Sequence, residues 1–201
     1  RETIQCPTGM VTVGLVAHVG SILDRIGIRC GTITGADQAT VSVTSASTIT
    51  FGSTLALTAT GGTTGGALTF TTTGACTVSG STLTATGNAG STCSVTATRA
   101  ANANYAAKAS PAQTVTIQRA ANTISFTNPG TRTWTATPFN ATTSATSGIT
   151  PSITSTTPSV CSASGIAITM LSSGTCSLTA TQGETTNHVA AAADAQSFPN
   201  N

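Results

Sequence analysis

Apolar and polar residues alternate along most of the chain, which is the period of a half-buried β-strand. Leu55, Leu57 and Ala59 fall on one face of such a strand, and the neighbouring threonines fall mostly on the other. Threonine is β-branched and favours extended backbone, so it suits the solvent-facing side. The same alternation recurs at Cys76/Val78, Leu83/Ala85, Cys93/Val95/Ala97, Val115/Ile117, Ile124/Phe126, Trp134/Ala136, Ile166/Ile168/Met170 and Cys176/Leu178/Ala180. The pattern predicts an all-β protein.

The chain also contains an internal repeat. Cys-Ser-Val-Thr-Ala-Thr at 93–98 matches Cys-Ser-Leu-Thr-Ala-Thr at 176–181, an offset of 83 residues. Other matches indicate short insertions or deletions between the strands of the two copies. They are Asn104 with Asn187 and Gln113 with Gln196 at the same offset, Cys76 with Cys161 at 85, and Phe51 with Phe126, each ending a Thr-Ile-Thr/Ser-Phe segment, at 75.

Each copy has room for about seven short strands separated by turn residues such as Gly61-Gly62 and Asn128-Pro129-Gly130. This spacing is typical of a β-sandwich of the immunoglobulin (Ig) type. We therefore expect two tandem immunoglobulin-like β-sandwiches, residues 40–119 and 120–201, after a small disulfide-closed β unit, residues 1–39. The junction between the copies is too short for a flexible tether, so we expect a fixed orientation between them.

Composition narrows the function. Charged residues make up 6 % of the chain, against roughly 25 % in a typical soluble domain, and the hydroxyls of 46 threonines hydrate the surface instead. One lysine and six scattered arginines do not form the basic patch that phosphate contacts need, which excludes a nucleic-acid-binding protein. Two histidines and five acidic residues argue against a metalloenzyme or an acid–base enzyme. No apolar run reaches the length of a membrane span.

The six cysteines indicate the compartment. The chain has no Cys-x-x-Cys motif and no histidine close to a cysteine, which favours disulfides over a metal site. Disulfides persist in oxidising surroundings, so we expect a secreted or extracellular protein.

Two segments of the second copy carry a resemblance to a known family. They are Pro-Ser-Val-Cys-Ser-Ala-Ser-Gly at 158–165 and Ser-Gly-Thr-Cys-Ser-Leu-Thr-Ala-Thr-Gln at 173–182. Residues 40–201 resemble the bacterial Ig-like domains that occur in tandem on cell-surface and secreted proteins. The resemblance implies a bridge between the two cysteines of each copy, and a last strand that follows Asn-Tyr-Ala-Ala at 104–107. It also implies a spacer, adhesin or assembly module on a bacterial cell surface. The second copy departs from the pattern by carrying His188-Val189 in place of Tyr-Ala.

The segment from Cys6 to Cys30 resembles a cysteine-bounded β-hairpin repeat of secreted bacterial proteins and of β-prism-like, lectin-related folds. In some relatives such units bind sugar, a role that would rest here on Asp24 and nearby backbone.

With these resemblances and the internal repeat, we expect the bridges Cys6–Cys30, Cys76–Cys93 and Cys161–Cys176. Six cysteines permit about 15 pairings, so the alternatives remain open. Each expected bridge closes a short loop and would stabilise the chain by roughly 3 kcal/mol.

Few residues could carry catalysis. His18, Ser21 and Asp24 are close in sequence, but along a strand and turn they point in different directions, so we expect no catalytic site. We also expect no metal site and no cofactor. Trp134 lies in an alternating segment, which favours a core position over stacking on sugar. Lys108 has no acidic residue in its copy, so we expect no Lys–Asn isopeptide crosslink.

Two classes of function remain open, and neither is an enzyme. The first is an extracellular structural protein, a subunit of a surface filament, sheath or stalk, with further copies of itself as partners. Low charge favours this class because subunits repel one another weakly. The alternative is an adhesin or carbohydrate-binding module, with carbohydrate or the cell envelope as partner.

The end of the chain suggests a route of assembly. Pro199 cannot donate a backbone hydrogen bond, so we expect the last strand to stop near Phe198 and to leave an incomplete sheet edge. An extended segment of a neighbouring copy could complete this edge by strand donation. The candidate assembly residues are Thr3, Ile4 and Gln5 or Val41 and Val43 as donors, and Phe198 and Pro199 at the acceptor.

Overall fold

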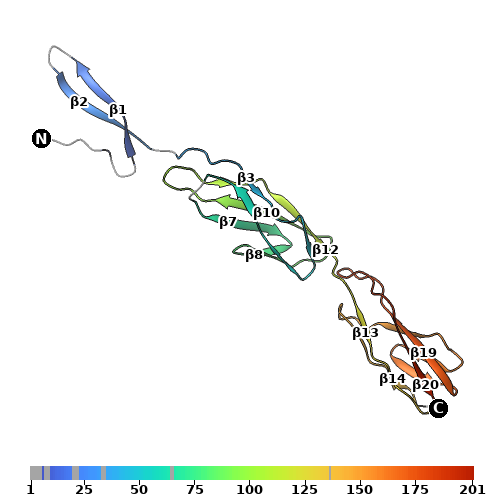
Figure 1. Ribbon diagram of the computed structural model, residues 1–201. Helices are drawn as coiled ribbons and strands as arrows, with labels where there is room; N and C mark the ends of the chain where they lie inside the picture. Colours follow the sequence, from blue (N-terminus) through green and yellow to red (C-terminus); the bar gives the residue numbers. More distant parts are fainter. Residues whose placement is uncertain (1–5, 7–9, 20–22, 33–34, 64–65, 136) are drawn as a thin grey trace.

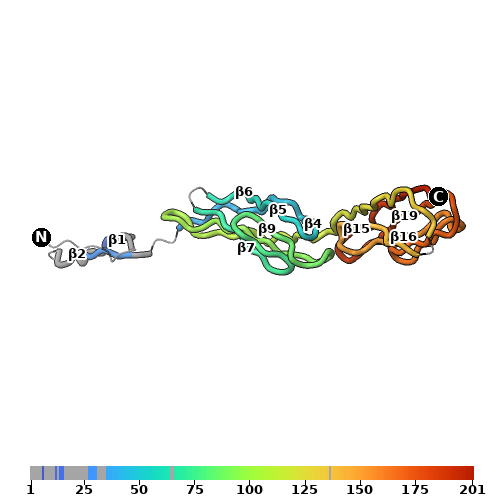
Figure 2. The backbone as a smooth tube through the Cα atoms, turned by 90° about the horizontal axis from the view of Figure 1, so that it is seen from below, coloured from blue at the N-terminus to red at the C-terminus, as the bar shows by residue number. Residues whose placement is uncertain are grey.

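The computed structural model describes residue 6 and residues 10–19, 23–32, 35–63, 66–135 and 137–201. Figures 1 and 2 show an elongated array, in which a hairpin is followed by two β-sandwiches and the C-terminus lies at the far end of the second. In the described ranges, no helix is long and apolar enough to cross a membrane.

The first element is an antiparallel hairpin of β1 (Met10–Val19) and β2 (Leu23–Thr32). A disulfide between Cys6 and Cys30 ties the segment before β1 to β2. The hairpin stands apart from the sandwiches in both views (Figures 1 and 2). An isolated two-stranded hairpin is only marginally stable in water, so the covalent closure matters here. The proposed donor residues Thr3, Ile4 and Gln5 lie outside the described residues, and their role stays a prediction.

The first sandwich consists of two facing layers. One sheet has the order β4–β12–β10–β7, and β11 also pairs with β10. The other layer contains the sheet β5–β9–β8 and the pair β3–β6. Neighbouring strands of this sandwich are antiparallel except β4 and β12, which are parallel. The strands are β3 (Val41–Val43), β4 (Thr48–Thr50), β5 (Thr54–Ala56), β6 (Ala59–Gly61), β7 (Leu68–Gly74), β8 (Cys76–Ser79), β9 (Thr82–Ala85), β10 (Thr92–Arg99), β11 (Lys108–Ala109) and β12 (Gln113–Gln118).

The second sandwich repeats this plan with the sheet β16–β19–β20 in one layer, and the sheet β14–β18–β17 and the pair β13–β15 in the other. Its strands are β13 (Ile124–Phe126), β14 (Phe139–Asn140), β15 (Thr143–Ala145), β16 (Ser152–Ser155), β17 (Cys161–Ser164), β18 (Ala167–Met170), β19 (Gly174–Thr181) and β20 (Asp194–Asn200). Disulfides join the two layers of each sandwich, Cys76–Cys93 between β8 and β10 and Cys161–Cys176 between β17 and β19. The three bridges are those expected from the sequence.

Each sandwich has its own hydrophobic core. In β10, Cys93, Val95 and Ala97 are buried, whereas Ser94 and Thr96 between them are only half-buried. The first core also contains Ile49, Leu57, Cys76, Leu83, Ala85, Val115 and Ile117. The second contains Phe126, Ala141, Ile153, Cys161, Ile168, Met170, Cys176, Leu178, Ala180 and Phe198. The all-β class and the tandem Ig-like β-sandwiches predicted from the alternation are confirmed.

The first sandwich begins earlier than residue 40. Ala36 pairs in parallel with Tyr105. The side chain of Gln38 is 4 % exposed, and its amide group donates to the carbonyls of Ala100 and Ala106 at 2.8 Å each. These two residues, which the sequence placed in the N-terminal unit, pack in the sandwich.

The structure corrects one part of the repeat alignment. The N–H of Thr44 donates to Thr58 just after β3, and the N–H of Thr127 donates to Thr142 just after β13. The strands β3 and β13 are therefore equivalent at an offset of 83, so Phe126 corresponds to Val43. Its expected match with Phe51 at an offset of 75 is wrong.

The true counterpart of Phe51 is Trp134. The N–H of Phe51 donates to Gln118 beside the last strand of the first sandwich, at 2.8 Å. The N–H of Trp134 donates to Asn201 at the same place in the second, at 3.0 Å. Trp134 is 54 % exposed, so the expectation that it belongs to the core is also wrong.

The last strand does not stop near Phe198. β20 runs to Asn200, and Pro199 pairs with Thr175 of β19. The outer edge of β20 is covered by the chain itself, because Arg132 donates its N–H to the carbonyl of Pro199 and accepts from the N–H of Asn201. The open acceptor edge expected at Phe198 and Pro199 is therefore absent from the described second sandwich.

The second expected donor segment is also occupied. Val41 is fully buried in its own sandwich, and β3, which contains Val41 and Val43, pairs with β6. Donation of this strand would require removing it from its own core. The structure therefore contradicts the expected donation of the strand with Val41 and Val43 to the C-terminal edge.

Candidate functional site

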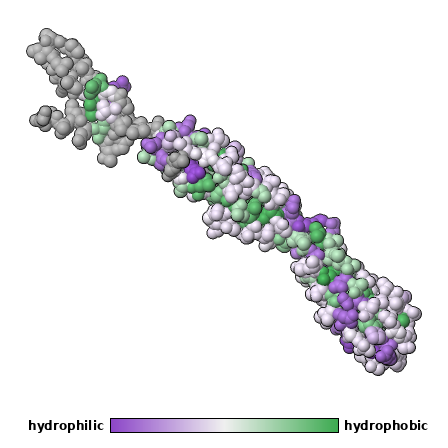
Figure 3. Space-filling model, viewed as in Figure 1, coloured by the Kyte–Doolittle hydropathy of each residue, from purple (hydrophilic) through white to green (hydrophobic). Residues whose placement is uncertain are grey.

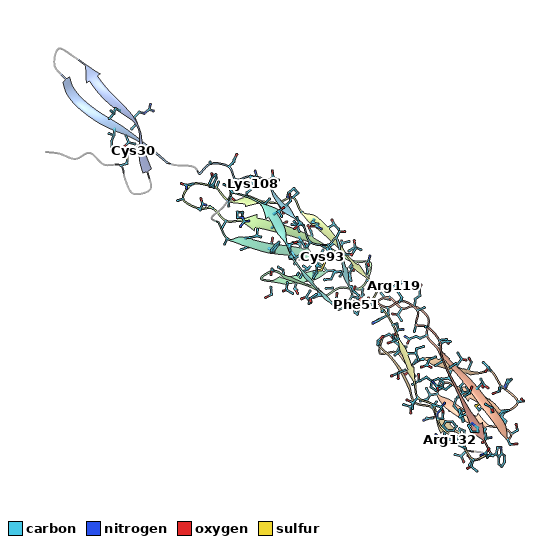
Figure 4. All side chains as sticks on the ribbon, in the orientation of Figure 1. Cys30, Phe51, Cys93, Lys108, Arg119 and Arg132 are labelled. Carbon is cyan, nitrogen blue, oxygen red and sulfur yellow. A yellow bond between two sulfur atoms is a disulfide. The ribbon has the colours of Figure 1, made fainter. Side chains whose placement is uncertain are left out.

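The candidate site is the junction between the two sandwiches, where side chains of one sandwich form hydrogen bonds with the other. Two structures form it. The first is the head loop of the second sandwich, residues 185–189. The second is the tail surface of the first sandwich, which consists of Phe51 and residues 88–89. In Figure 4, Phe51 and Arg119 are labelled side by side where the sandwiches meet.

Local hydrogen bonds shape the head loop. The hydroxyl of Thr185 accepts the N–H groups of Asn187 and His188, at 3.3 and 3.0 Å. The N–H of Thr185 in turn donates to the carbonyl of His188 at 2.9 Å. Such side-chain turns hold the loop backbone in one conformation. The side chains of Asn187 and His188 are thereby presented to the first sandwich.

Asn187 uses both ends of its amide across the junction. Its Nδ2 donates to Oδ1 of Asn88 at 3.0 Å, and its Oδ1 accepts the N–H of Ala89 at 2.9 Å. Next to it, the rings of His188 and Phe51 meet edge to face, with centroids 5.8 Å apart. Two convergent hydrogen bonds and a ring contact fix an orientation better than one apolar contact would.

The connecting segment has almost no slack. β12 ends at Gln118, and Ala120 is already paired with the head loop, donating to Asn187 and accepting from Val189 at 2.8 and 3.0 Å. Arg119 lies between them and forms an ion pair with Glu184. Both side chains are well exposed, so this ion pair contributes little. The short linker and the Asn187 contacts both favour the arrangement of the two sandwiches seen here.

The first sandwich has a head loop of the same construction at residues 102–106. Oδ1 of Asn102 accepts the N–H groups of Asn104 and Tyr105 at 2.9 Å each. Ala36 pairs with this loop as Ala120 pairs with the other. Tyr105 is therefore the counterpart of His188, and Asn104 that of Asn187.

The second sandwich likewise has a tail surface, Trp134 with residues 171–173. The loop of residues 171–173 is shorter than its counterpart in the first sandwich. The N–H groups of Leu171 and Ser172 donate to Val160 as those of Thr86 and Gly87 donate to Ala75, so the second sandwich has no residues equivalent to Asn88 and Ala89. Leu171, in this loop, is 48 % exposed. Figure 4 shows this far end of the molecule near the label of Arg132, whose guanidinium lies 4.2 Å from the ring centre of Phe139.

The described surface offers little for catalysis. A groove of about 430 Å³ is lined by Leu68, Thr69, Phe70, Gly80 and Ser81, none of which is ionisable. Within the described ranges, no three His, Cys, Asp or Glu side chains gather as metal ligands would. Ser21 and the side chains of His18 and Asp24 lie outside the described part. The visible surface of the sandwiches is mostly pale in Figure 3, between the hydrophilic and hydrophobic extremes.

Sequence reasoning did not single out the junction residues. It aligned Asn104 with Asn187 and noted His188 where the first copy has tyrosine, but it assigned neither a contact. A signal was present in the sequence: the same repeat position carries Tyr105 at one end of the molecule and His188 at the junction. Asn88 carries no local signal, because its role depends on what packs against it.

Comparison with known proteins adds little. No family model and no curated protein matches the chain. Among solved structures, the crystal structure of Drosophila N-cadherin EC1-4 matches at 8 % identity with a TM-score of 0.31, over 93 % of this chain and 57 % of that one. This chain thus spans less than two thirds of the matched structure, and a TM-score this low carries no argument. The strand order, the two cores and the bridges between layers themselves define a tandem Ig-like β-sandwich protein.

Proposed function

We propose that the protein is an extracellular structural protein, a stiff rod that forms part of a surface filament, sheath or stalk on a bacterium. The observation that carries the proposal is the junction. Only Arg119 lies between strand β12 and the paired Ala120, and this short linker and the double hydrogen bond of Asn187 hold the sandwiches end to end. A protein that only bound a ligand would not need this fixed geometry.

Two further observations support an extracellular location on a bacterium. Three disulfides, with no free cysteine among the described residues, suit an oxidising compartment. The resemblance of residues 40–201 to bacterial Ig-like domains suggests a cell surface.

Low charge supports self-association. With a formal net charge of +2 spread over 201 residues, neighbouring rods repel each other weakly. The Thr-rich surface stays hydrated through hydroxyl groups, which can form hydrogen bonds across a contact without the desolvation cost of burying charges. We therefore propose further copies of the same chain as its main partner.

Negative-stain microscopy of native extracellular material, labelled with an antibody against this chain, tests the proposal when combined with a glycan screen. Labelled filaments, sheaths or stalks, without sugar binding by the purified protein, are the expected result. Labelled material without any fibrous structure, together with monomers that bind sugar, would overturn it in favour of an adhesin.

A further inference from the structure

Each sandwich has one head loop and one tail surface, at opposite ends, and among the described residues one of each meets the other at the junction. The head loop with Asn187 and His188 rests on the tail surface with Phe51. The other head loop, at the near end of the first sandwich, presents Asn104 and Tyr105. The other tail surface, at the far end of the second, presents Trp134 and Leu171.

The unused tail surface is apolar and open. Trp134 and Leu171 are 54 % and 48 % exposed. Exposed apolar side chains of this size are unusual on a surface otherwise made of hydroxyl-bearing and small residues, and exposed apolar surface often marks contact sites. Its counterpart, Phe51, is partly covered by the ring of His188.

The head loop of the first sandwich presents the equivalent residues. The side chain of Asn104 is exposed, and Tyr105 is half-buried. Its backbone is held by Asn102 in the way that Thr185 holds the loop at the junction. It is thus already in the conformation that makes contacts in the second sandwich, so binding would cost little ordering.

We infer that the tail surface of the second sandwich of one copy binds the head loop of the first sandwich of a second copy, head to tail, in the manner of the internal junction. The inference names the self-contact of the proposed structural role and rests on that role. The ring of Tyr105 would meet Trp134 edge to face, as His188 meets Phe51. The loop of residues 171–173 has no counterparts of Asn88 and Ala89, so this contact would rest on the two rings and on the apolar side chain of Leu171.

This contact is between two different surfaces of the chain. A heterologous contact does not close on itself unless the rotation per subunit closes a ring, so it generates an open filament. The two-fold contact of a simple dimer would instead pair a surface with itself. The difference gives a sharp test.

Sedimentation velocity of the full chain with two single variants makes that test. Tyr105→Asp disables the head loop only, and Trp134→Asp disables the tail surface only. We expect the wild type to show a mass that rises with concentration above 19.7 kDa, and each variant alone to associate at least tenfold more weakly. An equimolar mixture should form dimers and nothing longer. The intact tail surface of the Tyr105→Asp variant can bind the intact head loop of the Trp134→Asp variant, and the dimer then has no intact surface left.

Two controls keep the test decisive. Ile149→Asp changes a residue of similar exposure, 53 %, that lies between β15 and β16 and away from both free surfaces, so association should be unchanged. Asn104→Arg, at an exposed position, replaces Tyr105→Asp if thermal melting shows that the latter unfolds the sandwich.

Three results would overturn the inference. They are a wild type that stays monomeric at millimolar concentration, variants that associate as strongly as the wild type, and mixed variants that remain monomers. Native filaments that persist with these variants would refute this contact and leave the proposed structural role standing. Native material without filaments would count against the role itself.

Discussion

Asn187 illustrates how one residue can determine the geometry between two domains. Its amide makes two hydrogen bonds to the first sandwich. A net hydrogen bond is worth about 0.5–1.5 kcal/mol, so Asn187→Ala should weaken the junction by roughly 1–3 kcal/mol and leave both cores intact. Small-angle X-ray scattering should then show a bent, broader ensemble with a smaller radius of gyration.

Asn104→Ala is the matched control, because Asn104 holds the same place in a head loop that contacts no second sandwich within the chain. Its scattering curve in dilute solution should superimpose on that of the wild type. Equal bending in both variants would mean that the alanine substitutions act through loop stability rather than through the junction.

The buried bridge of the second sandwich has a local effect on stability. Cys161 and Cys176 are fully buried and join β17 to β19. Replacing both with alanine should lower the stability of the second sandwich by about 2–4 kcal/mol, because the unfolded chain gains freedom. Calorimetry should resolve a lower melting transition for that sandwich and an unchanged one for the first. A uniform shift of both transitions would contradict two separate cores.

At the scale of strands, the segment around Arg132 completes the edge of β20. Arg132→Pro removes the N–H that bonds the carbonyl of Pro199. Compared with Arg132→Ala, which loses the same contact with Phe139 but keeps the N–H, we expect a further loss of about 1 kcal/mol in the free energy of unfolding. Urea denaturation measures the difference. Equal stability of the two variants would show that this backbone pairing does not hold the edge.

Strand existence was predictable from sequence, but pairing was not. Alternation at Cys93, Val95 and Ala97 identified β10 and its buried face. The similar segments ending at Phe51 and Phe126 were matched wrongly, because short Thr-Ile-x-Phe runs fit any half-buried strand. Which strands are equivalent is decided by the strands that they pair with and not by their residue types.

Pro199 shows why a local rule failed. In the first sandwich its counterpart Thr116 donates its N–H outward, to Ser47, and not to β10. A proline at this position removes one bond to the edge segment and leaves the ladder between β19 and β20 intact. The sequence alone does not say which side of a strand an N–H faces, so the strand was expected to end too early.

The shape of the whole molecule depends more on the junction than on either core. Interfaces between domains of one chain are commonly mobile. Here only Arg119 separates strand β12 from the paired Ala120, and the Asn187 amide and the His188 ring oppose bending. The head loops could be aligned from sequence, but their contacts required knowledge of which ends face each other.

Residual dipolar couplings test the central claim, a rigid two-sandwich rod, most directly. Couplings are measured for backbone N–H groups of both sandwiches in one alignment medium, and an alignment tensor is fitted to each sandwich. The account predicts one common tensor, with the same magnitude and with axes that coincide when the sandwiches are placed as in Figure 1. Two tensors that differ in magnitude by twofold or more would show independent motion and contradict the rod.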